Sequence, residues 1–171
     1  VDLYSTAEVE EKLNNINLGP LKSRKAIEAV FKKFNIPVEE SKNISLKIRS
    51  KMPVGKGMAS STADIGATIG ATLGLIKKEL SSEEIAKLAS TIEPTDSIYI
   101  EKNSIFNPLN GEVIRYLGNV KDLRVVILEP NSTLNTMRIR KTPNYKKIKT
   151  QNKEIIKISF SLLEEGIKSN D

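Results

Sequence analysis

The chain has 171 residues, of which 39% are hydrophobic and 28% charged, and its formal net charge is +6 at pH 7. This balance is typical of a folded globular domain, and no apolar run approaches the ~20 residues that a membrane-spanning helix needs. The sequence has no Cys and no His, which excludes disulfides, thiolate or imidazole metal sites and a Ser-His-Asp triad, and leaves Asp, Glu, Lys and Tyr for acid–base chemistry.

The first half of the chain alternates predicted strands and helices. Residues 1–9 alternate apolar and polar side chains as a strand does, and a turn signal follows at 14–20. A helix is predicted over 22–34, because five apolar side chains share one face: Ala26, Ile27, Val30, Phe31 and Phe34. Residues 44–49 predict a strand whose inward side chains are Ile44, Leu46 and Ile48. A long helix is predicted over 60–76, after a glycine-rich turn.

The next helix carries its start signal in the sequence. Ser81 is a good N-cap, and Glu84, three residues later, completes a capping box. Pro94 should end the helix. Its apolar stripe consists of Ile85, Leu88, Ala89 and Ile92.

The second half predicts three further strands and one last helix. Two strands are expected over 97–101 and 112–117, with turn residues at 107–111. The near-continuous apolar run at 123–129 predicts a central strand, and apolar residues at helical spacing predict one helix over 144–168. Strands interleaved with packed helices indicate an α+β fold.

The glycine-rich turn before the long helix raises the functional question. Gly55 and Gly57 permit positive φ and a close approach of a ligand to the backbone. The helix that begins at Ser60 offers unpaired N–H groups and a partial positive charge, so the turn predicts an anion site, most often for phosphate. The hydroxyls of Ser60 and Ser61 can donate to phosphate or bind Mg²⁺, and Lys56 can add a positive charge.

The body of the same helix is rich in small residues. Gly66, Gly70 and Gly74 form one row along it, and each costs roughly 1 kcal/mol of helix stability relative to alanine. This row predicts a helix pressed close to neighbouring backbone, which would hold its N-terminus rigidly. From the pattern alone, a capped core helix without a ligand is the alternative. A Walker A loop is excluded, because no Lys follows the glycines.

Residues 53–63, PVGKGMASSTA, resemble the phosphate-binding motif P-x-x-x-G-L-x-S-S-A of the GHMP kinases, the superfamily of galactokinase, homoserine kinase, mevalonate kinase and phosphomevalonate kinase. Pro53, Gly57, Ser60 and Ser61 match this motif, whereas Met58, Ala59 and Thr62 depart from it. Together with IEPTDS at 92–97 and the opening VDLYST, the departures resemble the L-threonine kinase branch, associated with cobalamin biosynthesis and propanediol utilisation.

The resemblance implies a GHMP-kinase N-terminal domain, with a mixed sheet of left-handed βαβ type packed on helices. It implies ATP and Mg²⁺ as cofactors and phosphoryl transfer to a small-molecule hydroxyl, with L-threonine as the first choice and homoserine or another metabolite as the alternative. The residues that it places on the nucleotide are Pro53, Gly55, Lys56, Gly57, Met58, Ala59, Ser60, Ser61 and Thr62. It makes Ser61 and Glu93 the expected Mg²⁺ ligands and Asp96 the catalytic base. From the pattern alone, the residues around Asp96 predict the end of a helix followed by a turn.

The resemblance also predicts the domain organisation. Residues 1–137 are expected to be the ATP-binding N-terminal domain, incomplete at its start, and residues 138–171 a linker with the first helix of a C-terminal domain. Such a piece is expected to be inactive by itself, and the enzyme to be cytoplasmic, with no membrane or nucleic-acid partner. The alternative of another class is an RNA-binding module, because residues 131–171 hold nine of the 27 Lys and Arg against four of the 21 Asp and Glu.

Overall fold

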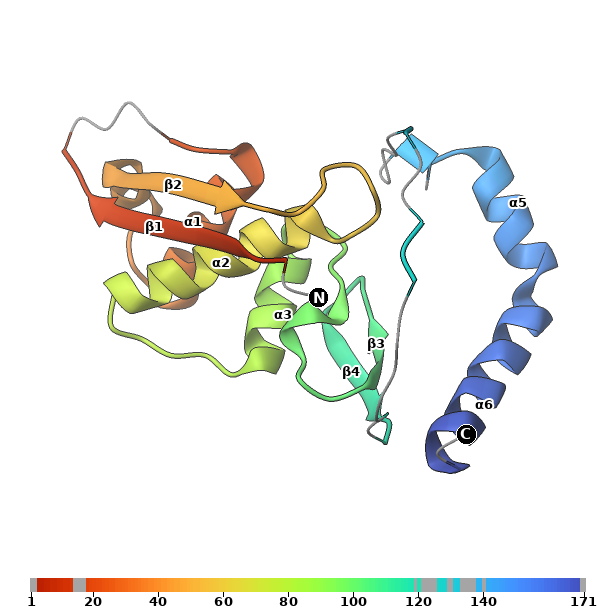
Figure 1. The fold of residues 1–171 in the computed structure, drawn as a ribbon. Coiled ribbons are helices and arrows are strands. Elements are labelled where there is room, and N and C mark those ends of the chain that lie inside the picture. The colour runs from red at the N-terminus through yellow and green to blue at the C-terminus, as the bar shows by residue number, and fades with distance from the viewer. Residues whose placement is uncertain are drawn as a thin grey trace.

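The computed structural model describes residues 3–13, 18–118, 120, 126–128, 131–132, 138–139 and 141–169. Their elements are β1 (Ser5–Glu11), α1 (Leu21–Lys33), η1 (Val38–Asn43), β2 (Ile44–Ser50), α2 (Ser60–Leu75), α3 (Ser82–Ser90), η2 (Ser97–Tyr99), β3 (Ser104–Asn107), β4 (Glu112–Tyr116), α5 (Pro143–Gln151) and α6 (Lys153–Ser169). Figure 1 shows small sheets packed on helices, which confirms the predicted α+β class.

The strands of the described residues form two antiparallel pairs rather than one mixed sheet. β1 pairs with β2 in the register Ser5 with Ser50 through Glu11 with Ile44. β3 pairs with β4, with an irregularity between Ile105 and Phe106. Alternation divides the β1–β2 pair into two faces, because successive strand side chains point to opposite sides. The inner face packs on the core through side chains that include Ala7, Val9, Leu46 and Ile48.

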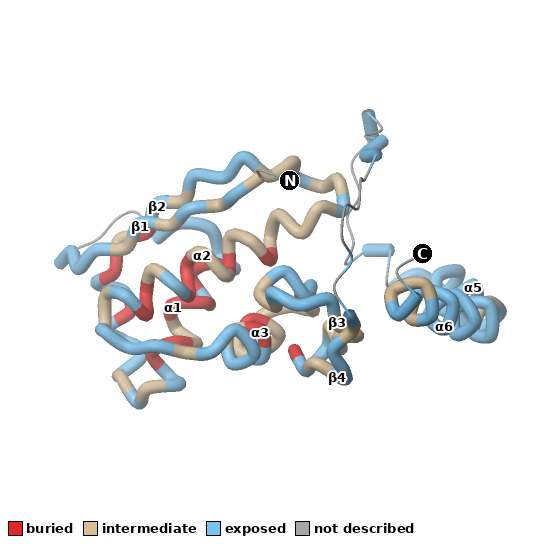
Figure 2. Tube along the Cα trace, turned by 60° about the horizontal axis from the view of Figure 1, so that its bottom comes forward, coloured by how far each residue is buried: buried red, intermediate tan, exposed pale blue. Residues whose placement is uncertain are grey.

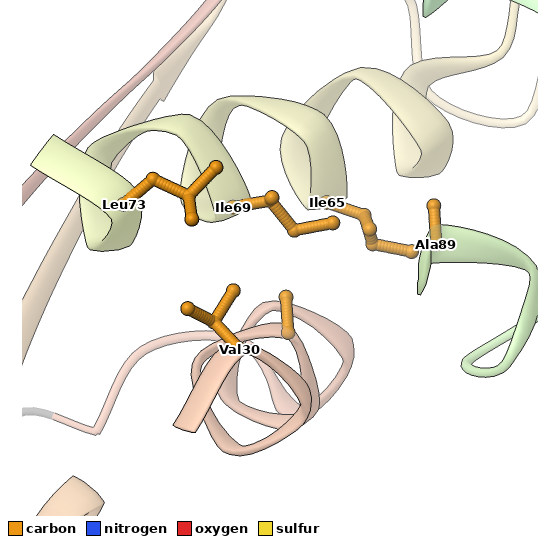
Figure 3. Packing of buried hydrophobic residues seen from close by; sticks show 6 residues of the cluster. Val30, Ile65, Ile69, Leu73 and Ala89 are labelled. Atoms are coloured by element: carbon orange, nitrogen blue, oxygen red, sulfur yellow. The ribbon is translucent and has the colours of Figure 1, made fainter. Parts of the chain in front are cut away.

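Helix α2 lies between the β1–β2 pair and the other core helices (Figures 1 and 2). Ile65, Ile69 and Leu73 of α2 point toward Val30 of α1 and Ala89 of α3, as Figure 3 shows. A second cluster joins α1 to β2 through Ile27, Phe31, Ile44 and Leu46. The apolar faces predicted for α1 and β2 are therefore confirmed, and α2 packs on the core through Ile65, Ile69 and Leu73.

The predicted capping box of α3 is confirmed. Ser81 Oγ accepts a hydrogen bond from Glu84 N at 3.2 Å, and Glu84 Oε2 accepts one from Ser81 N at 3.0 Å. This backbone donor lowers the pKa of the Glu84 carboxyl, since it favours the charged form. The helix ends at Ser90, a few residues before Pro94.

We expect Ser81→Ala to lower the free energy of unfolding by about 1 kcal/mol at neutral pH, because the cap is lost. Urea unfolding measures this loss, and Ser82→Ala is the control, since Ser82 is the first residue of the helix and is not its N-cap. The folded-state pKa of Glu84 is lowered. Glu84 therefore adds to the free energy of unfolding above the ordinary glutamate pKa, and this stabilisation is lost as the pH falls through the lowered value. An equal loss in both variants would contradict the prediction.

Three predicted elements of the second half differ in the structure. The strand predicted over 97–101 is wrong, because residues 97–99 form the 3-10 helix η2 and the strand β3 follows it. The single helix predicted over 144–168 is two helices that break at Asn152, whose side-chain Nδ2 donates to the Ile148 carbonyl at 2.8 Å. For the strand predicted over 123–129, residues 126–128 are exposed and outside any strand, and the rest lies outside the described residues.

Helices α5 and α6 lie beside the core and contribute no buried residue to it (Figure 2). α6 contacts β4 through an ion pair in which Arg115 Nε donates to Glu164 Oε1 at 2.8 Å, and Ile167 lies against Gly118. Much of its apolar surface is exposed, including Ile155, Ile156, Ile158, Leu162 and Leu163. None of the helices in the described part of the chain has the length and apolar character to cross a membrane.

Candidate functional site

The loop between β2 and α2 has the backbone geometry of a ligand-binding turn. Gly55 has φ 72°, Gly57 φ 73° and Ala59 φ 57°, all in the left-handed region. Ala59 is the N-cap of α2 and has no side-chain oxygen with which to cap it. The first-turn N–H groups of α2 are therefore left for a ligand or water, and the helix dipole favours an anion there.

Three side chains from distant parts of the chain meet beside the first turn of α2. Ser61 Oγ donates to Glu93 Oε1, which brings together the two residues predicted to bind Mg²⁺. Lys22 Nζ donates to Ser61 Oγ at 3.0 Å and to Glu93 Oε2 at 2.5 Å. The Glu93 side chain is 11% exposed and that of Lys22 is 48% exposed. Glu93 is thus a largely buried carboxylate whose ion-pair partner approaches from solvent.

Sequence reasoning missed Lys22. It is one of 27 basic residues, and it lies at the start of α1, about 40 residues before Ser61 in the sequence. A basic residue in the first turn of a helix opposes the helix dipole, but this weak local signal does not indicate which residues Lys22 contacts. Only the packing of α1 against α2 brings its side chain to the site.

Asp96 contacts the same helix turn through Thr62. Thr62 Oγ1 donates to Asp96 Oδ2 at 3.5 Å, a long contact, and Asp96 is exposed at the start of η2. Tyr99, in η2, donates from its hydroxyl to the Thr62 carbonyl at 2.5 Å. Burial raises the pKa of the Tyr99 phenol, so this hydroxyl keeps its proton at physiological pH. Tyr99 thereby ties the segment that carries Asp96 to the first turn of α2.

The other predicted nucleotide-binding residues lie along the loop itself. Pro53, Gly55, Lys56, Met58 and Ser60 are half-buried, and Gly57 is exposed with nothing within 4 Å of an added Cβ. Lys56 Nζ donates to the carbonyl of Ser132 at 3.3 Å. The structure thus places all the predicted site residues on one loop, one helix start and the segment at 93–96.

The donor set at Ser61 and Glu93 suits Mg²⁺. Both residues offer hard oxygen ligands, and the two side chains already touch. Among the described residues, no group of three or more acidic, His or Cys side chains could hold a metal. Mg²⁺ is commonly held by one or two carboxylates together with substrate phosphates. The pair therefore fits a metal that arrives with a phosphate ligand.

The site combines a loop with residues of positive φ, the uncapped start of α2 and the contact between Ser61 and Glu93. These features define the class of protein: an α+β protein with a candidate phosphate site. Residues 22–100 match the family described as GHMP kinases N terminal domain. This part of the chain, which holds the entire candidate site, is a GHMP kinase N-terminal domain.

The chain is similar to two L-threonine kinases. It is 36% identical to that of Salmonella typhimurium (strain LT2) over 148 residues, which are 86% of this chain and 49% of that protein. It is 32% identical to that of Citrobacter freundii over 145 residues, which are 85% and 50% of the two chains. The chain thus spans about half the length of these relatives.

Among solved structures, the chain resembles the crystal structure of the Methanococcus jannaschii mevalonate kinase. The TM-score is 0.53 at 22% sequence identity, and the match covers 94% of this chain and 63% of that one. This similarity supports the fold. The roles of Ser61, Glu93 and Asp96 stay predictions.

Proposed function

We propose that the protein is a cytoplasmic ATP- and Mg²⁺-dependent kinase that phosphorylates L-threonine on its hydroxyl in cobalamin biosynthesis. The observation that carries the proposal is the contact between Ser61 and Glu93 at the uncapped start of α2. In a GHMP kinase domain, this contact puts two hard oxygen ligands beside helix amides that suit phosphate. Threonine as the acceptor is supported by the similarity to the two L-threonine kinases.

The proposed chemistry assigns a separate task to each part of the site. Pro53, the residues from Gly55 to Thr62 and the first-turn amides of α2 bind the nucleotide phosphates. Ser61 and Glu93 would hold Mg²⁺, which neutralises phosphate charge when bound. The threonine hydroxyl oxygen bonds to the γ-phosphorus as the bond to the ADP oxygen breaks, and the hydroxyl proton passes to the Asp96 carboxylate. Positioning and charge neutralisation supply most of the catalysis in such a transfer.

The domain assignment is also part of the proposal. We assign residues 1–137 to the ATP-binding domain and 138–171 to a linker and the first helix of a second domain. The support is that α5 and α6 add no buried residue to the core, whereas α1, α2 and α3 share one hydrophobic cluster. By this assignment the 171-residue chain binds Mg·ATP weakly and turns over little threonine in isolation.

A panel of acceptors tests the function. We expect the protein at its natural length to transfer labelled γ-phosphate to L-threonine with a kcat/KM at least tenfold above that for homoserine or mevalonate. Mevalonate lacks the amino group that such a site would hydrogen-bond, whereas homoserine has both the amino and the carboxyl group but carries its hydroxyl one carbon further from them, away from the reacting position. A preference for homoserine would change the acceptor but keep the kinase, whereas no ATP-dependent transfer to any hydroxyl would overturn the proposal.

A further inference from the structure

The ammonium group of Lys22 occupies the point at which the two proposed metal ligands converge. Its Nζ lies 3.0 Å from Ser61 Oγ and 2.5 Å from Glu93 Oε2. Ser61 also donates to the other oxygen of the same carboxylate. The three groups come from α1, α2 and the segment after α3, so packing rather than local sequence assembles this arrangement.

Glu93 needs a positive partner in the absence of metal. Its side chain is 11% exposed, and a largely buried carboxylate without a counter-charge is strongly unfavourable. Lys22 supplies that charge through a half-exposed side chain. Because the ammonium reaches the site from solvent on a flexible stem, it can withdraw without leaving a cavity behind.

Metal and ammonium cannot share this position. Mg²⁺ binds oxygen at about 2.0–2.1 Å in near-octahedral geometry, so the Ser61 and Glu93 oxygens would have to turn from Lys22 to the ion. Two like charges on the same pair of oxygens repel each other. Binding of a divalent cation therefore requires the ammonium to leave.

We propose that Lys22 is a positioning residue that acts as a stand-in cation: it holds Ser61 and Glu93 together in the unloaded site and is displaced when Mg²⁺ binds. This inference rests on the proposed Mg²⁺ role of Ser61 and Glu93. The site is then already assembled before Mg²⁺ binds. Lys22 competes with the metal for the oxygens of Ser61 and Glu93, and this competition sets the metal affinity. The site then favours a metal that brings phosphate with it over the free ion.

The test measures Mn²⁺ binding to the protein at its natural length, without nucleotide, by the electron paramagnetic resonance signal of the free ion. We expect Lys22→Met to tighten Mn²⁺ binding about tenfold, since the competing ion pair is removed. Lys22→Arg restores a cation and should stay within about threefold of wild type. Lys25→Met, which removes the same charge from the same helix, is the matched control and should change the affinity less than about twofold.

Glu93→Gln separates failure of this inference from failure of the proposed function. If Glu93→Gln weakens Mn²⁺ binding but Lys22→Met leaves it at the wild-type value, the metal site stands and the stand-in role of Lys22 is overturned. If Mn²⁺ binding is the same in wild type, Glu93→Gln and Lys22→Met, the metal role of Glu93 is wrong and the role of Lys22 is overturned with it. If Lys25→Met tightens Mn²⁺ binding tenfold as Lys22→Met does, the change in affinity is due to net charge alone, and the inference is overturned as well.

Discussion

Replacing Gly66 by Ala is expected to lower the free energy of unfolding by about 1–3 kcal/mol, although alanine is the better helix former. A Cβ at this position would lie 2.3 Å from Tyr99 Cε1 and 3.2 Å from two more atoms of the ring. The ring has little freedom to yield, because it packs against the main core cluster and its hydroxyl donates to the Thr62 carbonyl at 2.5 Å. Urea unfolding of the two proteins measures the loss.

Gly70→Ala is the matched control on the same helix. Gly70 is exposed, and nothing lies within 4 Å of an added Cβ. We therefore expect this variant to raise the free energy of unfolding by about 0.5–1 kcal/mol through helix propensity alone. The two substitutions add the same methyl group to one helix, so opposite signs isolate the contact with Tyr99. Equal effects of both would contradict the close packing of Gly66.

The same contact bears on the site. Tyr99 links the first turn of α2 to the segment that carries Asp96, so displacing its ring changes the spacing between the phosphate-binding turn and the proposed base. Catalysis is sensitive to shifts of about 1 Å in such spacings. In the natural-length enzyme, Gly66→Ala should therefore lower kcat by more than its loss of stability explains.

Elements with strong local signals could be predicted from the sequence. The apolar face of α1, the alternation of β2 and the capping box at Ser81 and Glu84 each depend on side chains within a few residues of one another. The loop before α2 was predicted for the same reason, because Gly55 and Gly57 adopt the positive φ that glycine permits. These features require no knowledge of which elements pack together.

Features that depend on tertiary contacts could not be predicted in this way. The three glycines of α2 look alike in sequence, but only Gly66 meets a neighbour, and that neighbour is a side chain rather than backbone; Gly70 and Gly74 face open space. The alternation at 97–101 suggested a strand, yet Tyr99 turns inward to Thr62 while Ile98 stays exposed. Lys22 joins the site only because α1 packs on α2.

Replacing Asp96 by Asn is expected to lower the kcat of the natural-length enzyme for L-threonine about 10²- to 10⁴-fold, since the amide cannot accept the hydroxyl proton. The fold should tolerate the change. Asp96 is exposed, and its contact with Thr62 Oγ1 is long at 3.5 Å, so the free energy of unfolding should move by less than about 0.5 kcal/mol. Calorimetry should find the affinity for Mg·ATP within about twofold of wild type.

Asp64→Asn distinguishes a base from an acidic residue that merely lies near the phosphate site. Asp64 is also in the first turns of α2, but its Oδ1 accepts a hydrogen bond from Ser5 Oγ at 2.6 Å, which ties the helix to β1. We expect this variant to lower stability while keeping kcat within a few-fold, because its carboxylate is engaged in the fold. A large loss of kcat in Asp64→Asn with little in Asp96→Asn would move the base to α2. Equal small losses would instead mean that proton transfer to a carboxylate contributes little, and that positioning and charge neutralisation at Ser61 and Glu93 carry the reaction.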